Sequence, residues 1–136
     1  MTGFISGYNV HSDGVFDDTP WQTSELLLLK MKVFCEANPD TAFVRGVGGL
    51  ISSLADGRLE NASDLVSVRN QGRAVMLYRE TLDVVREALE GAGYAITDAD
   101  GTFGSTFAEA LTNFQSARGL PETGLPDQVT LNRLLN

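Results

Sequence analysis

The sequence predicts an all-α protein, with five or six helices and no sheet beyond a short strand near the N-terminus. Three observations lead to this prediction. Apolar residues recur at helical spacing throughout residues 20–136. Residues that start helices, such as Thr, Asp and Pro, and residues that stop them, such as Gly, punctuate the same stretch. Sustained alternation of apolar and polar residues, which marks a half-buried strand, does not stand out.

Composition and charge narrow the class of protein further. The chain has 136 residues, of which 43% are hydrophobic and 21% charged, typical of a soluble globular protein. The net charge of −8 disfavours nucleic acid and anionic membrane surfaces as partners. No apolar run approaches the roughly 20 residues that a membrane-spanning helix needs. A single cysteine, Cys35, and a single histidine, His11, are too few for an internal disulfide or an ordinary structural zinc site, so no cofactor or metal is expected.

Residues 1–18 are rich in Gly, Asp, Ser and Asn and predict an irregular arm, with a short strand around Phe4–Tyr8. This start has neither the basic region nor the long apolar region of a secretory signal peptide, so we expect synthesis in the cytoplasm without a signal peptide. Solvated turn residues are favoured over a metal or acid–base site for the polar side chains of the arm, which are His11, Asp13, Asp17 and Asp18.

Residues 19–75 predict a helical region whose role the sequence does not define. Thr19-Pro20 is typical of a helix start, and the first helix should run to about Ala37. Its apolar residues cover most of the circumference, so we expect it to be buried on more than one side. Asp40 can cap a second helix, in which Gly46, Gly48 and Gly49 indicate a close helix–helix approach. A third, short helix is expected from Asn61 and should break near Gln71-Gly72.

Residues 76–136 predict a separate helical bundle. Its first helix should run from about Ala74 to Glu90 and stop at Gly91 and Gly93. A second helix is expected at the capping-box pattern that starts with Thr106, and Asp127 should cap the last one. The side chains expected inside this bundle are Tyr78, Leu82, Val85, Leu89, Phe107, Leu111, Phe114, Leu131 and Leu134.

From about Leu82 onward a series of short motifs carries a family resemblance. In chain order they are Leu89…Gly93-Tyr94, Asp100-Gly101-Thr102-Phe103-Gly104, Ala110…Phe114-Gln115, Gly119-Leu120, Thr123-Gly124 and Thr130…Leu134. In this order and spacing, the last 55 or so residues resemble the peptidoglycan-binding domain found beside many bacterial cell-wall hydrolases. The resemblance implies a small three-helix bundle, preceded here by the N-terminal helical region.

The resemblance also implies a function and a site. The function is non-catalytic binding of peptidoglycan, in a bacterial or phage context, with the polymer held in a shallow groove. The residues that it marks for ligand binding are Asp100, Gly101, Phe103, Gly104, Gln115, Thr123 and Gly124. Two positions depart from the family's pattern: Arg86 stands where Gln is usual, and Phe107 where Thr is usual. Both departures weaken the transfer of ligand contacts to those positions.

Two alternatives stay open at the level of the sequence. The chain could be an adaptor or inhibitor of a phage or secretion system that reuses the fold and meets a protein partner, or a second copy, through its N-terminal helices. A small cell-wall hydrolase is less favoured, because nothing pairs the available carboxylates Glu25, Glu36 and Asp40. As a peptidoglycan-binding protein or as a wall hydrolase, the protein would act at the cell wall or in the periplasm. It would reach that site by a route that needs no signal peptide.

Overall fold

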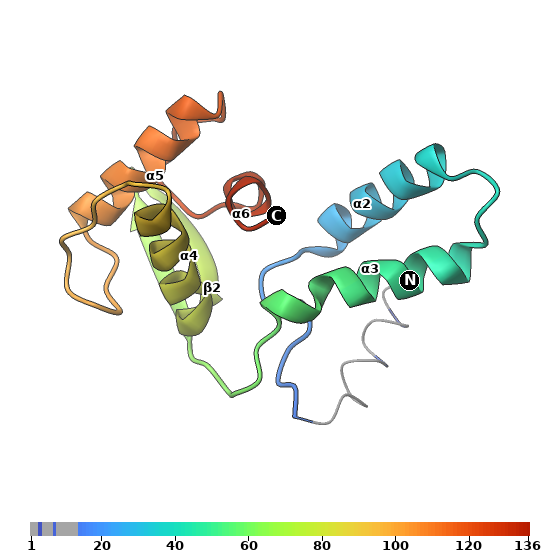
Figure 1. Ribbon diagram of the computed structural model, residues 1–136. Helices are drawn as coiled ribbons and strands as arrows, with labels where there is room; N and C mark the ends of the chain where they lie inside the picture. Colours follow the sequence, from blue (N-terminus) through green and yellow to red (C-terminus); the bar gives the residue numbers. More distant parts are fainter. Residues whose placement is uncertain (1–2, 4–6, 8–13) are drawn as a thin grey trace. The chain divides into compact units, whose positions relative to one another are not determined.

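The structure is a computed structural model that describes Gly3, Gly7 and residues 14–136 (Figure 1). The chain forms two compact units, Met1–Ala62 and Ser63–Asn136, and each is described by itself. The predicted strand around Phe4–Tyr8 lies, apart from Gly7, outside the described residues, as do His11 and Asp13. Gly7 itself has helical backbone.

The first unit is a helical hairpin. Helix α2 (Ser24–Ala37) and helix α3 (Phe43–Leu54) lie side by side, and a short 3₁₀ helix, η1 (Ala55–Gly57), follows (Figure 1). Leu27 and Leu54 are buried between the two helices. A Cβ atom at Gly46 would lie only 2.8 Å from the Phe34 ring, so the predicted close approach is confirmed at this glycine. At Gly48 and Gly49 the prediction is wrong, because a Cβ atom there would meet no atom within 4 Å.

Both helices of the hairpin begin later than the sequence predicted. The side chain of Thr23, not that of Thr19, caps α2 by accepting a hydrogen bond from the Leu26 N–H at 3.3 Å. Thr19 bonds to Asp17 instead, whose carboxylate accepts from the Thr19 N–H at 2.9 Å and from its hydroxyl at 3.5 Å. The N-cap of α3 is Ala42, without a side-chain hydrogen bond, so the predicted cap at Asp40 is wrong.

Helix α2 buries one face within the chain. Leu26, Leu27 and Met31 are buried and point to the hairpin core. By contrast, Leu28, Leu29 and Val33 are 54%, 56% and 57% exposed. The burial expected on a second side of this helix is therefore not supplied by the part of the chain that the structure describes.

The second unit opens with a two-stranded antiparallel sheet, which corrects the prediction of a sheet-free protein. Strand β1 (Leu65–Asn70) pairs with β2 (Arg73–Tyr78), where the sequence predicted a short helix and the start of a long one. The turn residues Gln71 and Gly72 both have positive φ, 46° and 77°, as a tight two-residue hairpin requires. Val68 and Leu77 lie on the same face of the pair and are buried.

Three helices complete this unit: α4 (Arg79–Gly91), α5 (Ser105–Ala117) and α6 (Gln128–Leu134). Helix α4 packs against β2, α5 and α6 (Figure 1). The predicted stop of α4 at Gly91 and the cap of α6 by Asp127 are both confirmed. Of the side chains expected inside the bundle, Tyr78 and Leu134 are half-buried, and all the others are buried: Leu82, Val85, Leu89, Phe107, Leu111, Phe114 and Leu131.

The described part of the chain is therefore mostly helical, with one small sheet. The predicted domain boundary between residues 75 and 76 falls inside β2, and the two units divide between Ala62 and Ser63. Among the described residues, no helix combines the length and apolar character needed to span a bilayer.

Candidate binding groove

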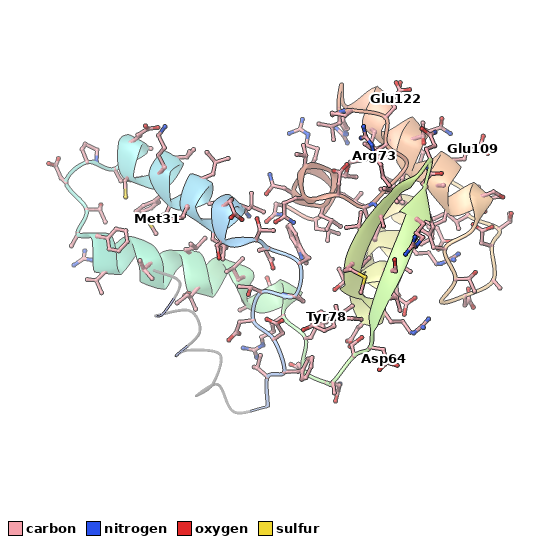
Figure 2. The ribbon with its side chains drawn as sticks, turned by 180° about the vertical axis from the view of Figure 1, so that it is seen from behind. Met31, Asp64, Arg73, Tyr78, Glu109 and Glu122 are labelled. Atoms are coloured by element: carbon pink, nitrogen blue, oxygen red, sulfur yellow. The ribbon has the colours of Figure 1, made fainter. Side chains whose placement is uncertain are left out.

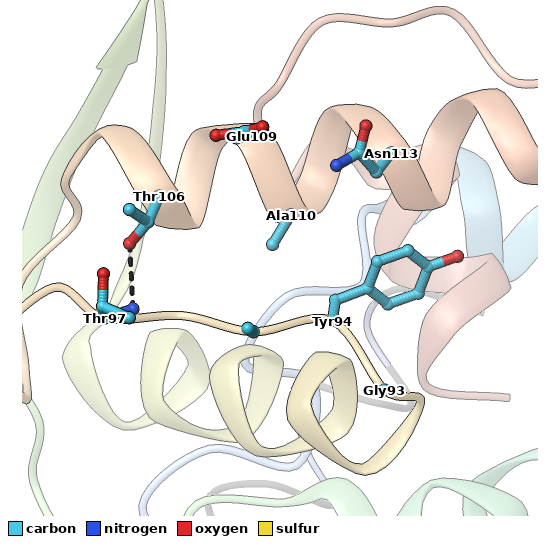
Figure 3. Close-up of a pocket in the computed structure, with 8 residues that line it drawn as sticks. Gly93, Tyr94, Thr97, Thr106, Glu109, Ala110 and Asn113 are labelled. Atoms are coloured by element: carbon cyan, nitrogen blue, oxygen red, sulfur yellow. Dashed lines mark hydrogen bonds between the residues drawn. The ribbon is translucent and has the colours of Figure 1, made fainter.

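A groove of about 420 Å³ lies between α5 and the segment Gly93–Thr97 that follows α4 (Figure 3). Four of its lining residues come from α5, at positions i, i+3, i+4 and i+7, which share one face of a helix. The adjacent face of α5 carries the buried core residues Phe107, Leu111 and Phe114, and the buried Ala110 lies between the two faces. The amphipathic sequence of α5 thus turns a partly polar face toward the groove. The lining residues are Gly93, Tyr94, Ala95, Thr97, Thr106, Glu109, Ala110 and Asn113.

The second wall of the groove is a segment without regular structure. Gly93, with φ of 91°, follows the C-cap residue Ala92 of α4 and lets the chain reverse. The N–H of Tyr94 still bonds to the Leu89 carbonyl at 3.0 Å, and its ring packs edge-on against Phe114, with 6.0 Å between the ring centroids. Residues 94–97 then run alongside α5 outside any helix, strand or turn (Figure 3).

One end of the groove is closed by hydrogen bonds. The hydroxyl oxygen of Thr106 accepts from the N–H of Thr97 at 3.0 Å and from the N–H of Asp98 at 3.1 Å (Figure 3). The Thr106 side chain therefore ties the segment to the first turn of α5. The capping-box role predicted for Thr106 is wrong, because α5 begins at Ser105 and this hydroxyl serves the loop instead.

Asp98 caps α5 from outside the helix. Its carboxylate accepts a hydrogen bond from the Phe107 N–H at 2.7 Å. A Cβ atom on the N-cap residue Gly104 would overlap the Asp98 carboxylate, so this glycine makes room for the cap. The hydrogen bond from Phe107 is the main cause that lowers the pKa of Asp98 below its ordinary value, with smaller contributions from Thr106 and from the charge of Arg86.

Arg86 and Phe107, the two positions that depart from the family's sequence pattern, are in contact inside the second unit. Arg86 is buried, and its guanidinium lies 5.0 Å from the centroid of the Phe107 ring. It donates hydrogen bonds to the carbonyls of the loop that precedes α5: Asp98 at 3.2 Å, Ala99 at 3.2 Å and Thr102 at 2.9 Å. Arg86 therefore holds this loop from within, and its contacts are structural.

The residues predicted for binding at 100–104 form that same loop and do not line the groove. Asp100 is exposed, and the carbonyl of Gly101 accepts a hydrogen bond from the Arg79 guanidinium at 2.9 Å. Phe103 is half-buried and packs on the Phe107 ring at a centroid distance of 5.2 Å. Gly104 is the N-cap of α5.

The remaining predicted residues, Gln115, Thr123 and Gly124, meet in an internal network. The Gln115 side chain is fully buried, and its Nε2 lies within 3.0 Å of the Thr123 hydroxyl, the Leu125 carbonyl and the Thr130 hydroxyl. Its Oε1 accepts from the Gly124 N–H at 2.8 Å. The Thr123 carbonyl in turn accepts from the Asn70 side chain at 2.9 Å.

The two predicted sets lie at opposite ends of α5. With Gly104 at the start and Gln115 near the end, the helical rise separates them by about 16 Å. The side chain of Gln115 is fully buried and bonded within the unit, and Gln115 does not line the groove. Sequence reasoning missed the groove residues, although one signal was present: Thr106, Glu109 and Asn113 share one polar face of α5, next to the face that carries its core.

Comparisons with known proteins agree with the motifs. Residues 79–134 match the family model described as "Putative peptidoglycan binding domain", which confirms the resemblance predicted for the C-terminal part of the chain. The match contains every residue that lines the groove.

One solved structure is similar at low identity: the crystal structure of SltB3 from Pseudomonas aeruginosa in complex with NAG-anhNAM-pentapeptide. The identity is 21% and the TM-score 0.42, and the comparison covers 78% of this chain and 27% of that one. This chain thus spans about a quarter of the length of that protein. No curated protein matches the chain.

Proposed function

We propose that residues 63–136 form a peptidoglycan-binding module, and that the wall polymer lies in the groove between α5 and Gly93–Thr97. The observation that carries this proposal is the family match over residues 79–134, which includes the whole groove lining. The volume of about 420 Å³ is within the range of small-ligand sites. Hydroxyl, amide and carboxylate groups line the groove and suit a polar ligand.

We further propose that the module binds the wall without cleaving it. A glycosidase places two carboxyl groups on either side of the scissile bond. The lining of this groove has one carboxylate, Glu109. Binding without chemistry is therefore the function that these side chains favour, with the cell wall or the periplasm as the site of action.

The test is co-sedimentation of the full chain with purified insoluble peptidoglycan, at two salt concentrations. Asn113→Trp should fill the groove and reduce recovery with the wall at least tenfold. Asn61→Trp is the matched control, because Asn61 is exposed and lies in the other unit, and recovery should not change. Recovery of the unsubstituted protein no better than that of an unrelated acidic helical protein would contradict the proposal. Release of soluble wall fragments by the pure protein would contradict its non-catalytic part.

A second candidate function is that of an adaptor or inhibitor that uses the α2–α3 hairpin to meet a protein partner or a second copy. The exposed apolar side chains of α2, Leu28, Leu29 and Val33, favour it. Sedimentation analysis of the pure protein tests the second-copy form. A dimer that dissociates in Leu29→Asp would support it, and a monomer at all concentrations would exclude it.

A further inference from the structure

We infer that the groove takes the peptide part of the wall polymer, in an extended conformation, and that Glu109 binds an ammonium group on that peptide. This inference rests on the proposed function and specifies which chemical part of the polymer the site recognises. Three features of the groove carry it: an unpaired backbone edge, its length, and its charge.

The backbone edge is formed by Ala95 and Ile96. Within the described part of the chain, the N–H and C=O groups of these two residues make no hydrogen bond. The N–H of Thr97 points at α5, since it bonds to the Thr106 hydroxyl. Ala95 itself lines the groove between Tyr94 and Thr97, so its N–H and C=O groups lie at the groove wall, with those of Ile96 next to them. Such an edge can pair with an extended peptide as an added strand does.

The length of the groove suits a short peptide. From Thr106 to Asn113 the helical rise gives about 10 Å. An extended peptide advances about 3.3 Å per residue, so about three residues fit along this wall. The bond between Thr97 and Thr106 closes one end of the groove.

The charge of the groove favours a cation on the ligand. Glu109 is the single charged residue of the lining, is exposed, and makes no ion pair or hydrogen bond with any residue that the structure describes. The side chain of Asn113 makes none either, so a carboxylate and an amide of the groove lining lie one helical turn apart along α5 (Figure 3). A peptide carbonyl can accept from the amide while an ammonium group bonds to the carboxylate.

The wall polymer consists of sugars and short peptides, and the sugar is the competing occupant. Tyr94, the one aromatic residue in the lining, has its ring packed edge-on against Phe114. The unpaired N–H and C=O of Ala95 instead complement a peptide backbone. The backbone edge, the length and the charge therefore favour the peptide over the sugar.

The experiment titrates the full ¹⁵N-labelled chain with three probes: the tripeptide N-acetyl-Ala-D-Glu-Lys, the same peptide also acetylated on the lysine side chain, and chitotriose. We expect the tripeptide to shift the amide signals of Ala95 and Ile96 and to bind about tenfold tighter than its acetylated form. Chitotriose should leave these signals in place. Glu109→Gln should remove the preference for the free amine without weakening the acetylated peptide.

Glu122→Gln is the matched control, because it makes the same change of charge at an exposed residue outside the groove, and the amine preference should persist (Figure 2). If chitotriose shifts the amide signals of Ala95 and Ile96 while the protein still co-sediments with the wall, the peptide inference is overturned. The proposed function then stands. Equal affinity for the two peptides would overturn the role of Glu109. A protein that neither co-sediments with the wall nor responds to the tripeptide would overturn both proposals.

Discussion

At the scale of single residues, the side chains that a family pattern marks can serve the fold instead of the ligand. Gln115 has such a structural role, because its buried Nε2 lies within 3.0 Å of three oxygen atoms and its Oε1 accepts from the Gly124 N–H. The sequence could not distinguish this role from ligand binding, since both require a polar side chain next to the buried Phe114. Arg86 is similar: sequence comparison marks it as a departure, but only the structure shows its three bonds to the loop.

Also at the scale of single residues, we predict that the stabilisation of α5 by the Asp98 cap is lost in acid. Its pKa in the folded chain is lowered from 3.8, mainly by the hydrogen bond from the Phe107 N–H. A lowered folded-state pKa means that the ionised carboxylate stabilises the fold above pH 3.8, and that this contribution is lost as pH falls through the folded-state value. The melting temperature of the unsubstituted chain should therefore exceed that of Asp98→Asn at pH 6, and the difference should shrink below pH 3.8.

The control for this prediction is Asp100→Asn in the same loop, whose carboxylate makes no hydrogen bond within the described part of the chain. It should retain the acid sensitivity of the unsubstituted protein. A difference between the protein and Asp98→Asn that stays constant from pH 6 to pH 2 would show that the cap does not depend on ionisation.

At the scale of secondary-structure elements, the helices were predictable and the β1–β2 hairpin was not. Helices α2 to α6 lie where apolar spacing and stop residues predicted them, with the ends shifted by a few residues at α2, α3 and α4. The hairpin was missed because Tyr78 continues the apolar spacing of α4 backwards, so Ala74–Glu90 resembled one helix. The signals for strands were present in Val66, Val68 and Val75, which are β-branched and alternate with outward-facing residues.

The hairpin turn carries its own prediction. Gln71 and Gly72 have φ of 46° and 77°. Residues other than Gly and Asn rarely adopt this left-handed backbone conformation. Gly72→Ala should lower the free energy of unfolding by about 1–2 kcal/mol, whereas Gln71→Asn should raise it by about 0.5 kcal/mol. Urea unfolding measures both changes.

Gly91→Ala is the matched control for the glycine substitution. Gly91 ends α4, has ordinary helical φ, and has open space where the Cβ would stand. The free energy of unfolding should stay the same or rise by up to about 1 kcal/mol, because alanine favours the helix. Loss of stability in Gly91→Ala equal to that in Gly72→Ala would refute the argument from the turn.

At the scale of the whole molecule, the sequence predicted two regions and a wall-binding C-terminal part, but not where the second unit starts. The hairpin belongs to the C-terminal unit because Val68 and Leu77 are buried in it and Asn70 bonds to the Thr123 carbonyl. The groove was not predictable either, since it depends on how the segment Gly93–Thr97 settles beside α5. Spacing along the chain fixes which face of α5 is polar, but not what lies opposite that face.

The position of the β1–β2 hairpin in the second unit predicts which fragment of the chain should fold by itself. A fragment of residues 63–136 should unfold cooperatively and should bind walls as well as the full chain does, because it retains the complete C-terminal unit. A fragment of residues 79–136, which keeps the family match, lacks the hairpin. It loses the buried side chains Val68 and Leu77, each 3% exposed or less, which together contribute roughly 3–6 kcal/mol.

That loss is large compared with the stability of an ordinary domain, about 5–15 kcal/mol. It also leaves the Thr123 carbonyl without its donor, next to the turn that Gln115 holds. We therefore expect the fragment of residues 79–136 to melt at a much lower temperature than residues 63–136, and to bind walls only at temperatures where it is folded. Thermal unfolding followed by circular dichroism gives the melting temperature of each fragment. Co-sedimentation at a temperature between the two melting temperatures then shows whether only residues 63–136 bind the wall. Equal melting temperatures would show that the hairpin is an appendage and that the family match alone defines the folding unit.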